Sequence, residues 1–433
     1  MSWTKKANKY LKKYWNISSL KDKQIEVIDE LLLGNDVIGL LPTGYGKSMC
    51  YIIPPLITKK IMFIISPLIS LMDEQKEKLL SLNIQCSALH GNNCNKDEEI
   101  QKIINGDIKI VYMSPEYLIN SDGLELARIL INNKTLGFFA VDESHCISAW
   151  GQDFRPEYTN INKFRENFPE IPIIAVTATA TKTVCDDITK ILYLDDPKIV
   201  KTSFDRPNLF ISIKELKEES SSKEYIIMEY INKFVNDKII IYTNSRKDTE
   251  EIALQLNKIK IDCCNAYHAG LTKKTRENIQ KKFTDGDIKV IISTIAFGMG
   301  IDQIVKCVLI FGSPSSIEEY YQQIGRGGRD GLPCETVLYF DYSKFKISEY
   351  MLKEFIKYPI LYKVKRKNLN NIKDFVYIKT CRRKYILEYF NEKCNFINCN
   401  NCDNCCRKIN KQPIKENDDF EDIINKYQNI YKL

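Results

Sequence analysis

Short apolar runs alternate with longer amphipathic segments from about residue 36 to residue 199. The runs are rich in β-branched residues and occupy residues 37–40, 61–65, 108–112, 138–141 and 173–176. Strands that alternate with helices are typical of a parallel sheet in an α/β domain. In such sheets ligands bind at the carboxyl ends of the strands. We therefore expect the site residues of this domain to follow its strands.

A second alternating set follows a break near residue 204. Its apolar runs occupy residues 239–242, 261–264, 290–293 and 308–311, and the set ends near residue 340. From about residue 346 the chain becomes helical and basic, with cysteines near its end. We predict two α/β parallel-sheet domains and a small helical subdomain. The predicted boundaries are 1–203 for the first domain, 204–210 for a linker, 211–345 for the second domain, 346–410 for the subdomain and 411–433 for a tail.

Length and composition agree with a multidomain intracellular protein. The 433 residues suffice for two or three domains that each bury a core. No apolar run approaches the roughly 18 residues of a membrane span, and the charged first residues do not resemble a secretory signal. Scattered cysteines fit a reducing compartment. Residues 346–393 hold 13 Lys and Arg against 5 Asp and Glu, with interleaved aromatics such as Tyr350, Tyr358 and Phe375, so this block is either a polyanion-binding surface or a solvated helical face.

A glycine-rich turn follows the first predicted strand. It reads T43-G-Y-G-K-S and leads into a new apolar segment. Backbone N–H groups of such a turn hold phosphates, the lysine reaches the β and γ groups, and the hydroxyl binds Mg²⁺. The strict pattern would require glycine at position 41, where the chain has Leu41. An ordinary turn with an incidental lysine is the alternative. We predict an ATP and Mg²⁺ site that includes Thr43, Gly44, Gly46, Lys47 and Ser48.

Two carboxylates, Asp142 and Glu143, directly follow another predicted strand. Asp142 is the expected magnesium residue, and Glu143 the residue that orients or deprotonates the attacking water. A helix-capping pair is the alternative. In the second domain Arg326 and Arg329 lie three residues apart after glycines, which suits contact with a γ-phosphate held by the first domain. We favour Arg329 as the finger and Arg326 as its partner, and we assign Gln322 of the same segment to the nucleotide.

The residues after the acidic pair are rich in aromatics. Trp150, Phe154 and Arg155 lie in this loop, together with Tyr158. Side chains of these types stack on nucleobases and can report their presence to the carboxylates. Packing of the aromatics in the core is the alternative. His145 is the residue expected to couple the loop to the γ-phosphate.

Four cysteines have the spacing C-x17-C-x2-C-x2-C: Cys381, Cys399, Cys402 and Cys405. Four thiolates suit a closed tetrahedral Zn²⁺ site. An iron–sulfur cluster is the rival, but position 409, where such a run would place another cysteine, is Ile409. Cys394 and Cys406 are alternative ligands.

Taken together, the motifs resemble the RecQ family of superfamily 2 DNA helicases over residues 17–406. The segments that carry the resemblance are L41-P-T-G-Y-G-K-S-M-C-Y, D142-E-S-H-C-I-S-A-W-G-Q-D-F-R-P-E-Y, S203-F-D-R-P-N, A296-F-G-M-G-I-D, Y320-Y-Q-Q-I-G-R-G-G-R-D-G and the cysteine element beginning at C381-R-R. The resemblance implies two RecA-like domains, a zinc-binding subdomain and ATP-dependent unwinding of DNA with 3′ to 5′ polarity. It also implies that Lys21 and Gln24 contact the adenine.

The chain departs from the family pattern in three places. Ile17 and Lys21 stand where relatives have an aromatic residue and an arginine, which leaves adenine selectivity open because Ile17 cannot stack like a ring. Ser144, Ala149 and Gln152 replace commoner residues around the acidic motif. The sequence given also ends without winged-helix or HRDC domains. We therefore expect DNA-stimulated ATP hydrolysis, with weak unwinding unless an accessory protein supplies a strand-separation wedge.

Two other functions remain open from the sequence. One is an RNA helicase or RNA-stimulated ATPase of the same superfamily. The other is a DNA-annealing scaffold with a weak motor. For the favoured function the expected substrate is single-stranded, forked or partly duplex DNA. We expect a monomer that works where DNA is, in a nucleus, a bacterial cytoplasm or a viral replication site.

Overall fold

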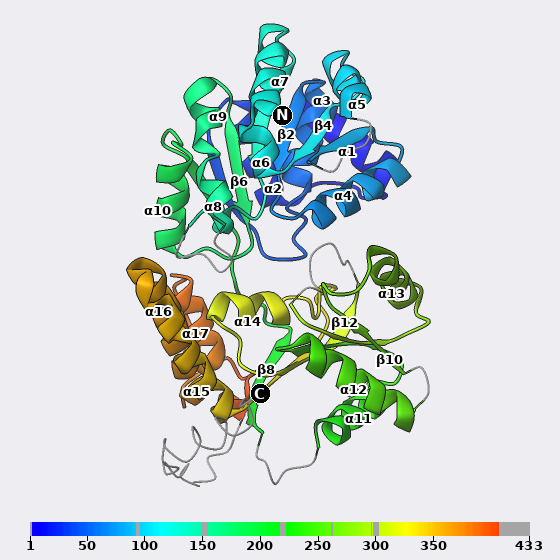
Figure 1. Ribbon diagram of the computed structural model, residues 1–433, viewed down its shortest axis with the longest axis vertical. Coiled ribbons are helices and arrows are strands. Elements are labelled where there is room, and N and C mark those ends of the chain that lie inside the picture. Colours follow the sequence, from blue (N-terminus) through cyan, green and yellow to red (C-terminus); the bar gives the residue numbers. More distant parts are fainter. Residues whose placement is uncertain are drawn as a thin grey trace.

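The computed structural model describes residues 2–91, 96–148, 155–216, 222–260, 263–295, 297 and 303–406, which form two sheet domains and a helical subdomain (Figure 1). The first domain contains a seven-stranded parallel sheet in the order β3-β4-β2-β5-β6-β1-β7. Its strands are β1 (Val37–Leu40), β2 (Ile61–Ile65), β3 (Cys86–Leu89), β4 (Ile110–Met113), β5 (Leu136–Val141), β6 (Ile173–Thr177) and β7 (Lys198–Lys201).

Helices cover both faces of this sheet, and a short 3-10 turn follows β5. These elements are α1 (Ser2–Trp15), α2 (Asp22–Leu32), α3 (Met49–Thr58), α4 (Ile69–Ser81), α5 (Lys96–Ile104), α6 (Pro115–Ile119), α7 (Ser121–Asn132), η1 (Ser144–Ile147), α8 (Pro156–Thr159), α9 (Asn162–Asn167) and α10 (Lys182–Ile191).

The second domain contains a six-stranded parallel sheet in the order β10-β11-β9-β12-β13-β8. Its strands are β8 (Leu209–Glu215), β9 (Lys238–Thr243), β10 (Cys264–Tyr267), β11 (Val290–Ser293), β12 (Val305–Phe311) and β13 (Cys334–Phe340). Its helices are α11 (Lys223–Lys233), α12 (Arg246–Ile259), α13 (Lys273–Asp285) and α14 (Ile317–Ile324). Helix α14 lies on the side of this domain that faces the first (Figure 1).

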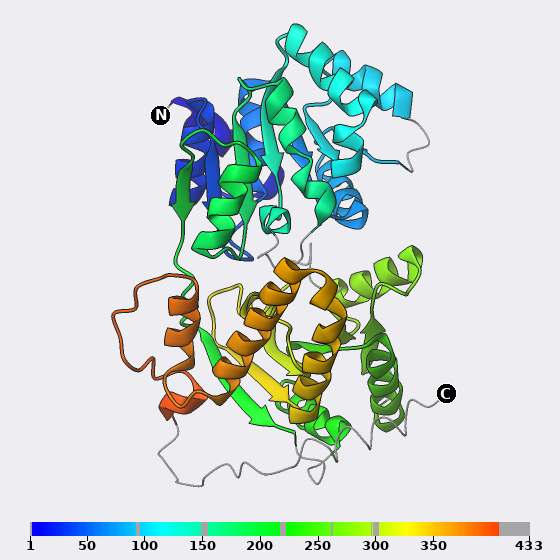
Figure 2. The same ribbon diagram turned by 60° about the vertical axis from the view of Figure 1, so that its left-hand side comes forward.

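The helical subdomain packs beside the second domain (Figure 2). It contains α15 (Tyr342–Met351), η2 (Leu352–Lys357), α16 (Pro359–Tyr377), α17 (Arg382–Tyr389) and α18 (Asp403–Cys406). Helices α15 and α16 form a hairpin joined by η2, and the joined end of this hairpin points toward the first domain (Figure 2).

The apolar runs became central strands because parallel strands are buried on both faces. In β2 every residue is buried, and alternate side chains enter different halves of the core. Phe63 and Ile65 pack with the helices of one face, whereas Met62 and Ile64 pack with those of the other. The two-domain parallel-sheet prediction is confirmed.

Some strands differ from the sequence prediction. The strands β3 and β7 were not predicted, because C86-S-A-L contains no β-branched residue and the two central residues of K198-I-V-K are flanked by exposed lysines. The strand expected at 261–264 begins only at Cys264, and residues 261 and 262 lie outside the described part. The strand β8 begins at Leu209, inside the predicted linker, because it pairs with β13.

The two domains touch across a cleft. Lys273 Nζ of α13 lies 3.2 Å from Asp73 Oδ2 of α4. Gln322 Nε2 of α14 donates a hydrogen bond to Thr179 Oγ1, 3.2 Å away in the first domain. Among the described residues, no helix has the length and hydropathy to cross a membrane.

Candidate functional site

The turn after β1 has the backbone of a phosphate cradle. Gly44 and Gly46 have φ of 82° and 88°, in the left-handed region that favours glycine. Gln24 Nε2 donates hydrogen bonds to the carbonyls of Tyr45 and Gly46, at 3.1 and 2.9 Å. A Cβ at Gly46 would lie 2.7 Å from this amide nitrogen. The turn leads directly into α3, so its N–H groups and the positive helix end can bind an anion.

A cavity of about 330 Å³ opens in front of this turn, between the two domains. Most of the predicted nucleotide residues line it, although they come from both domains. They are Thr43, Gly44, Gly46, Lys47, Ser48, Asp142, Glu143, His145, Gln322, Arg326 and Arg329. Lys21 and Gln24 are not among its lining residues. Gln24 lies behind the turn, and Lys21 Nζ lies 4.5 Å from the ring centre of Tyr45.

The acidic pair is held at the end of β5. Asp142 Oδ2 accepts a hydrogen bond of 3.0 Å from the Tyr51 hydroxyl, and its Oδ1 accepts one of 2.9 Å from the Glu143 N–H. Burial and the neighbouring Glu143 raise the pKa of Asp142 to about 6, although Lys47 and Tyr51 act in the opposite direction. Burial alone would also raise the pKa of Glu143, but the charges of Lys47, His145 and Arg326 outweigh it and lower that pKa. The pKa values of both carboxylates are therefore lowered by cations that line the cavity.

His145 links the acidic pair to the neighbouring strand. Its Nδ1 lies 2.8 Å from Thr177 Oγ1, in a hydrogen bond, and 3.4 Å from Glu143 Oε2. Thr177 ends β6, so His145 bridges the ends of two adjacent strands.

The two arginines extend from the turn after α14. An ideal Cβ at Gly44 would lie 3.2 Å from Arg329 Cγ, so the Arg329 side chain crosses the phosphate-loop glycine. Arg326 hydrogen-bonds the hydroxyl of Tyr242 at the end of β9 and lines the same cavity. Guanidinium groups from the second domain thus face the anion cradle of the first.

The aromatic loop is described only in part. Trp150 and Phe154 lie outside the described residues. Arg155 Nη1 donates a 2.5 Å hydrogen bond to the carbonyl of Pro67, which follows β2. Tyr158 is completely buried and packs in the domain core, so the expectation that it stacks on bases is wrong for this structure. Its position in α8, against the core helices, explains the difference.

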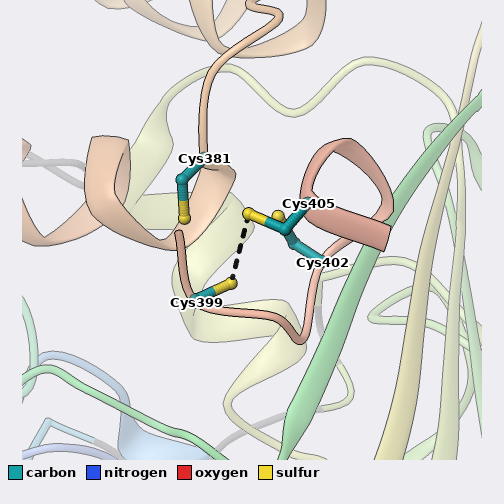
Figure 3. A group of neighbouring side chains, drawn as sticks. All are labelled: Cys381, Cys399, Cys402 and Cys405. Carbon is teal, nitrogen blue, oxygen red and sulfur yellow. Dashed lines mark hydrogen bonds between the residues drawn. The ribbon is translucent and has the colours of Figure 1, made fainter. Parts of the chain in front are cut away.

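Four cysteine thiols converge in the subdomain (Figure 3). Cys381 precedes α17, Cys399 lies in the following loop, and Cys402 and Cys405 lie at α18. Their sulfur atoms all lie within 4.8 Å of one another. Tetrahedral Zn–S bonds of about 2.3 Å would place sulfurs about 3.8 Å apart, so these four residues fit a zinc ion. The described part places neither alternative thiol in this group, since Cys394 and Cys406 hydrogen-bond the carbonyls of Phe396 and Asn400.

Two residues that affect the carboxylates at or near the cleft were not predicted from the sequence. Tyr51 lies in the first turn of α3, and no local signal marks it because its partner Asp142 lies 91 residues further along the chain. Glu74 of α4 is half-buried and hydrogen-bonds Gln280 of α13. Burial and the neighbouring Glu77 raise the pKa of Glu74 to about 7, although Lys78, Gln280 and Arg326 lower it. No local sequence signal identifies Glu74, because Gln280 and Arg326 lie in the other domain.

Three family models match the chain. Residues 21–188 match the DEAD/DEAH box helicase model, residues 222–331 match the helicase conserved C-terminal domain, and residues 343–406 match the RecQ zinc-binding model. The last match contains all four clustered cysteines. ATP with Mg²⁺ and zinc are the cofactors of such a chain.

Relatives match over almost the whole chain. A protein of Acanthamoeba polyphaga mimivirus, which carries the name of an ATP-dependent RNA helicase, is 38% identical over 95% of this chain and 74% of its own. The ATP-dependent DNA helicases RecQ of Pasteurella multocida and Haemophilus influenzae are each 37% identical, over 96% and 98% of this chain. The chain spans 64% and 66% of these two bacterial relatives.

Solved structures agree on the fold. The helicase MrfA bound to DNA matches with a TM-score of 0.65 and 18% identity, over 92% of this chain and 60% of that one. Saccharomyces cerevisiae Dbp5 bound to RNA and ADP BeF3 matches with a TM-score of 0.62 and 16% identity, over 85% of this chain and 97% of that one. At these identities the likeness concerns the fold alone. The zinc-binding match and the RecQ relatives show that the chain belongs to the RecQ family of ATP-dependent helicases.

Proposed function

We propose that this chain is a DNA helicase that hydrolyses ATP with Mg²⁺ between its two sheet domains and moves 3′ to 5′ along single-stranded DNA. Residues 2–203 and 209–340 form the motor, and residues 342–406 form the zinc-binding subdomain, so the second domain and the subdomain each begin earlier than the sequence predicted. One observation carries the proposal: the Arg329 side chain of the second domain lies across Gly44 of the first. A phosphate bound at Gly44 would be within reach of this guanidinium.

Each lining residue has a role that its chemistry supports. The loop N–H groups and Lys47 bind the β- and γ-phosphates, while Ser48 and Asp142 would hold Mg²⁺, which neutralises phosphate charge. Glu143 orients the attacking water, because its lowered pKa keeps it an anion that can accept a proton. Arg326 and Arg329 stabilise the charge of the transferring phosphoryl group. Gln322 adds a contact from the second domain, while Lys21 and Gln24, which do not line this cavity, are the proposed adenine contacts.

Hydrolysis would move the two domains relative to each other. The phosphates attract Arg326 and Arg329 only while the γ-phosphate is present, so ATP favours the closed cleft and its products favour an open one. A strand held by both domains is then pulled stepwise. His145 and Arg155 are proposed to pass the presence of DNA to Glu143, because His145 lies 3.4 Å from this carboxylate and Arg155 lies in the aromatic loop.

The α15–α16 hairpin supports a nucleic-acid substrate. Tyr350 and Tyr358 near its joined end are 60% and 62% exposed, and Lys353 Nζ lies 5.0 Å from the centre of the Tyr350 ring. Lysines beside exposed aromatics suit a strand with phosphates and unstacked bases. Phe375 is fully buried, so it is not part of this surface. RNA is the second candidate substrate, since the mimivirus relative is named an RNA helicase.

Steady-state ATPase assays with no polymer, single-stranded DNA and single-stranded RNA separate these candidates. We expect DNA to stimulate turnover most; equal or greater stimulation by RNA would favour the second candidate. Lys47→Ala is expected to abolish turnover, and Lys163→Ala on the surface of α9 is the control. Displacement of streptavidin from biotinylated DNA ends gives the polarity, and faster release from 5′ ends is expected for 3′ to 5′ movement.

A further inference from the structure

The segment that joins β7 to β8 contacts the turn that carries the two arginines. Nη2 of Arg206 donates hydrogen bonds to the carbonyls of Gly327 and Gly328, each at 2.9 Å. Asn208 Nδ2 donates to the Gly328 carbonyl at 2.8 Å and to that of Leu332 at 2.9 Å. These carbonyls lie between or just after Arg326 and Arg329. The segment therefore holds the turn from outside.

The turn needs such support because its centre is two glycines. Gly328 has φ of 57°, and a Cβ there would lie 2.4 Å from Asn208 Nδ2. Glycine fixes its own backbone least of all residues. A small rotation at this point would move both neighbouring guanidinium groups, and an error of about 1 Å at a reacting group can cost about 100-fold in rate. Arg206 and Asn208 are thus placed to determine where the arginines point.

Side chains of the zinc-binding subdomain donate hydrogen bonds to the backbone of the same segment. Asn401, between Cys399 and Cys402, donates from Nδ2 to the carbonyls of Pro207 and Leu209, at 2.8 and 3.2 Å. Arg383, two residues after Cys381, donates to the same two carbonyls at 3.2 and 2.9 Å. The segment consequently connects the loops that carry the cysteines with the turn that carries the arginines.

We propose that Arg206 and Asn208 are positioning residues for Arg326 and Arg329, and that the zinc-binding loop sets their segment through Asn401. The inference rests on the proposed function, in which the two arginines contact the γ-phosphate. It assigns a role to the motif S203-F-D-R-P-N, which the nucleotide site does not use. It also gives the zinc subdomain an influence on hydrolysis without any contact to the nucleotide.

Nucleotide binding separates positioning from stability. The beryllium fluoride complex of ADP occupies the γ-phosphate position that the arginines contact, whereas ADP alone leaves it empty. We expect Arg206→Gln to weaken ADP–beryllium fluoride binding about tenfold and to leave ADP binding within about twofold. The kcat of the ATPase falls similarly while KM changes little. The ADP–beryllium fluoride affinity and kcat of Arg206→Lys should lie between those of the wild type and Arg206→Gln. One ammonium group keeps the charge but bridges the two carbonyls poorly.

A matched arginine reports the cost of simple destabilisation. Arg165 of α9 also binds a backbone carbonyl, that of Pro169 at 2.6 Å, and it pairs with Asp36, but it lies away from the turn. Arg165→Gln is expected to lower Tm without changing the ratio of the two affinities. Equal loss of ADP and ADP–beryllium fluoride binding in Arg206→Gln, or no loss of either, would overturn the positioning role.

The zinc side is tested by two neighbouring asparagines. Asn404, between Cys402 and Cys405, also donates to two carbonyls, those of Ile378 and Thr380 at 2.8 Å each, but these lie within its own subdomain. Asn401→Ala should reduce ADP–beryllium fluoride affinity about threefold with one zinc retained per chain, as the loss of two hydrogen bonds allows. Asn404→Ala should not. Identical behaviour of the two variants would refute the coupling.

The variant Arg329→Ala distinguishes failure of the proposed function from failure of the inference alone. If this variant binds ADP–beryllium fluoride as tightly as the wild type, the arginine does not contact the γ-phosphate, and the proposed function falls together with the inference. If Arg329→Ala loses affinity but Arg206→Gln does not, only the inference falls.

Discussion

The hydroxyl of Tyr51 donates a 3.0 Å hydrogen bond to Oδ2 of Asp142, which lies 91 residues further along the chain. Both side chains are buried, Tyr51 on α3 and Asp142 at the end of β5. The contact favours the charged carboxylate, against the burial that raises the pKa of Asp142 to about 6. Since Mg²⁺ requires an ionised, oriented carboxylate, this tyrosine supports the proposed metal residue from within the core.

Removal of the Tyr51 hydroxyl is therefore expected to weaken the use of magnesium. We predict that Tyr51→Phe raises the Mg²⁺ concentration for half-maximal ATPase several-fold and costs about 1 kcal/mol of unfolding free energy. Titration of Mg²⁺ at fixed ATP measures the first effect, and denaturant unfolding the second. Tyr112→Phe is the control: Tyr112 is equally buried, and its hydroxyl has no hydrogen-bond partner among the described residues. Equal magnesium curves for both variants would contradict the role of Tyr51.

Glu74 predicts that closure of the cleft depends on pH. Burial against the second domain raises its pKa to about 7, while an open cleft would return it toward the ordinary value near 4.5. A carboxyl whose pKa is raised in the closed state favours closure most below the ordinary value, and this contribution is lost as pH rises through about 7. Energy transfer between labels on the two domains should thus show more closure at pH 6 than at pH 8.

The Glu74→Gln variant isolates this effect. It keeps the shape of the side chain and cannot ionise, so the closure it shows at pH 8 should match that at pH 6 more closely. Glu166→Gln, an exposed position on α9 of the same domain, should retain the pH dependence of the wild type. If the energy transfer of the wild type does not change between pH 6 and pH 8, Glu74 does not control closure of the cleft.

Zinc removal is predicted to destabilise the subdomain and the β7–β8 segment to which it is hydrogen-bonded. Cys402 is fully buried, and its segment also forms an isolated bridge with Ile211 of β8. We expect Cys402→Ser to lose the metal and to lower Tm by at least about 5 °C, because the metal sites of small domains contribute folding energy directly. Cys406→Ser should keep one zinc per chain, since the exposed Cys406 thiol hydrogen-bonds the Asn400 carbonyl. Metal analysis with thermal denaturation checks both, and zinc loss in Cys406→Ser would instead make it a ligand.

The hairpin surface predicts a local loss of DNA affinity. Tyr350→Ala is expected to weaken binding of single-stranded DNA at least about fivefold, as the loss of one stacked base would. Lys353→Ala should lower the number of counterions released on binding by about one, which is measured as the slope of log K against log salt concentration. Fluorescence anisotropy with a labelled oligonucleotide at several salt concentrations measures both. Tyr225→Ala, 58% exposed on α11 of the second domain, is the control, and an equal loss there would mean that the hairpin has no special role.

The sequence itself determined the elements that carry local signals. The buried strands β1, β2 and β6 appear where runs of apolar residues predicted them, because a strand buried on both faces needs apolar side chains at successive positions. The phosphate loop, the acidic pair and the run Cys399, Cys402 and Cys405 carry a local signal, since each has fixed residue types at short spacing, and the fold brings Cys381 to this run from 18 residues away. The polar strand β7 lacked such a signal, and only pairing with β1 forms it.

Only the tertiary structure decided which distant groups meet. Tyr51 reaches Asp142, Arg329 crosses Gly44, and Arg206 supports the glycine turn because sheet order and domain packing bring separate segments together. Glu74 is half-buried and hydrogen-bonds Gln280 of a helix in the other domain. Such contacts depend on burial and geometry in three dimensions, and neither residue type nor spacing along the chain encodes them locally. The same reason placed Tyr158 in the core, although its sequence position favoured a nucleobase contact.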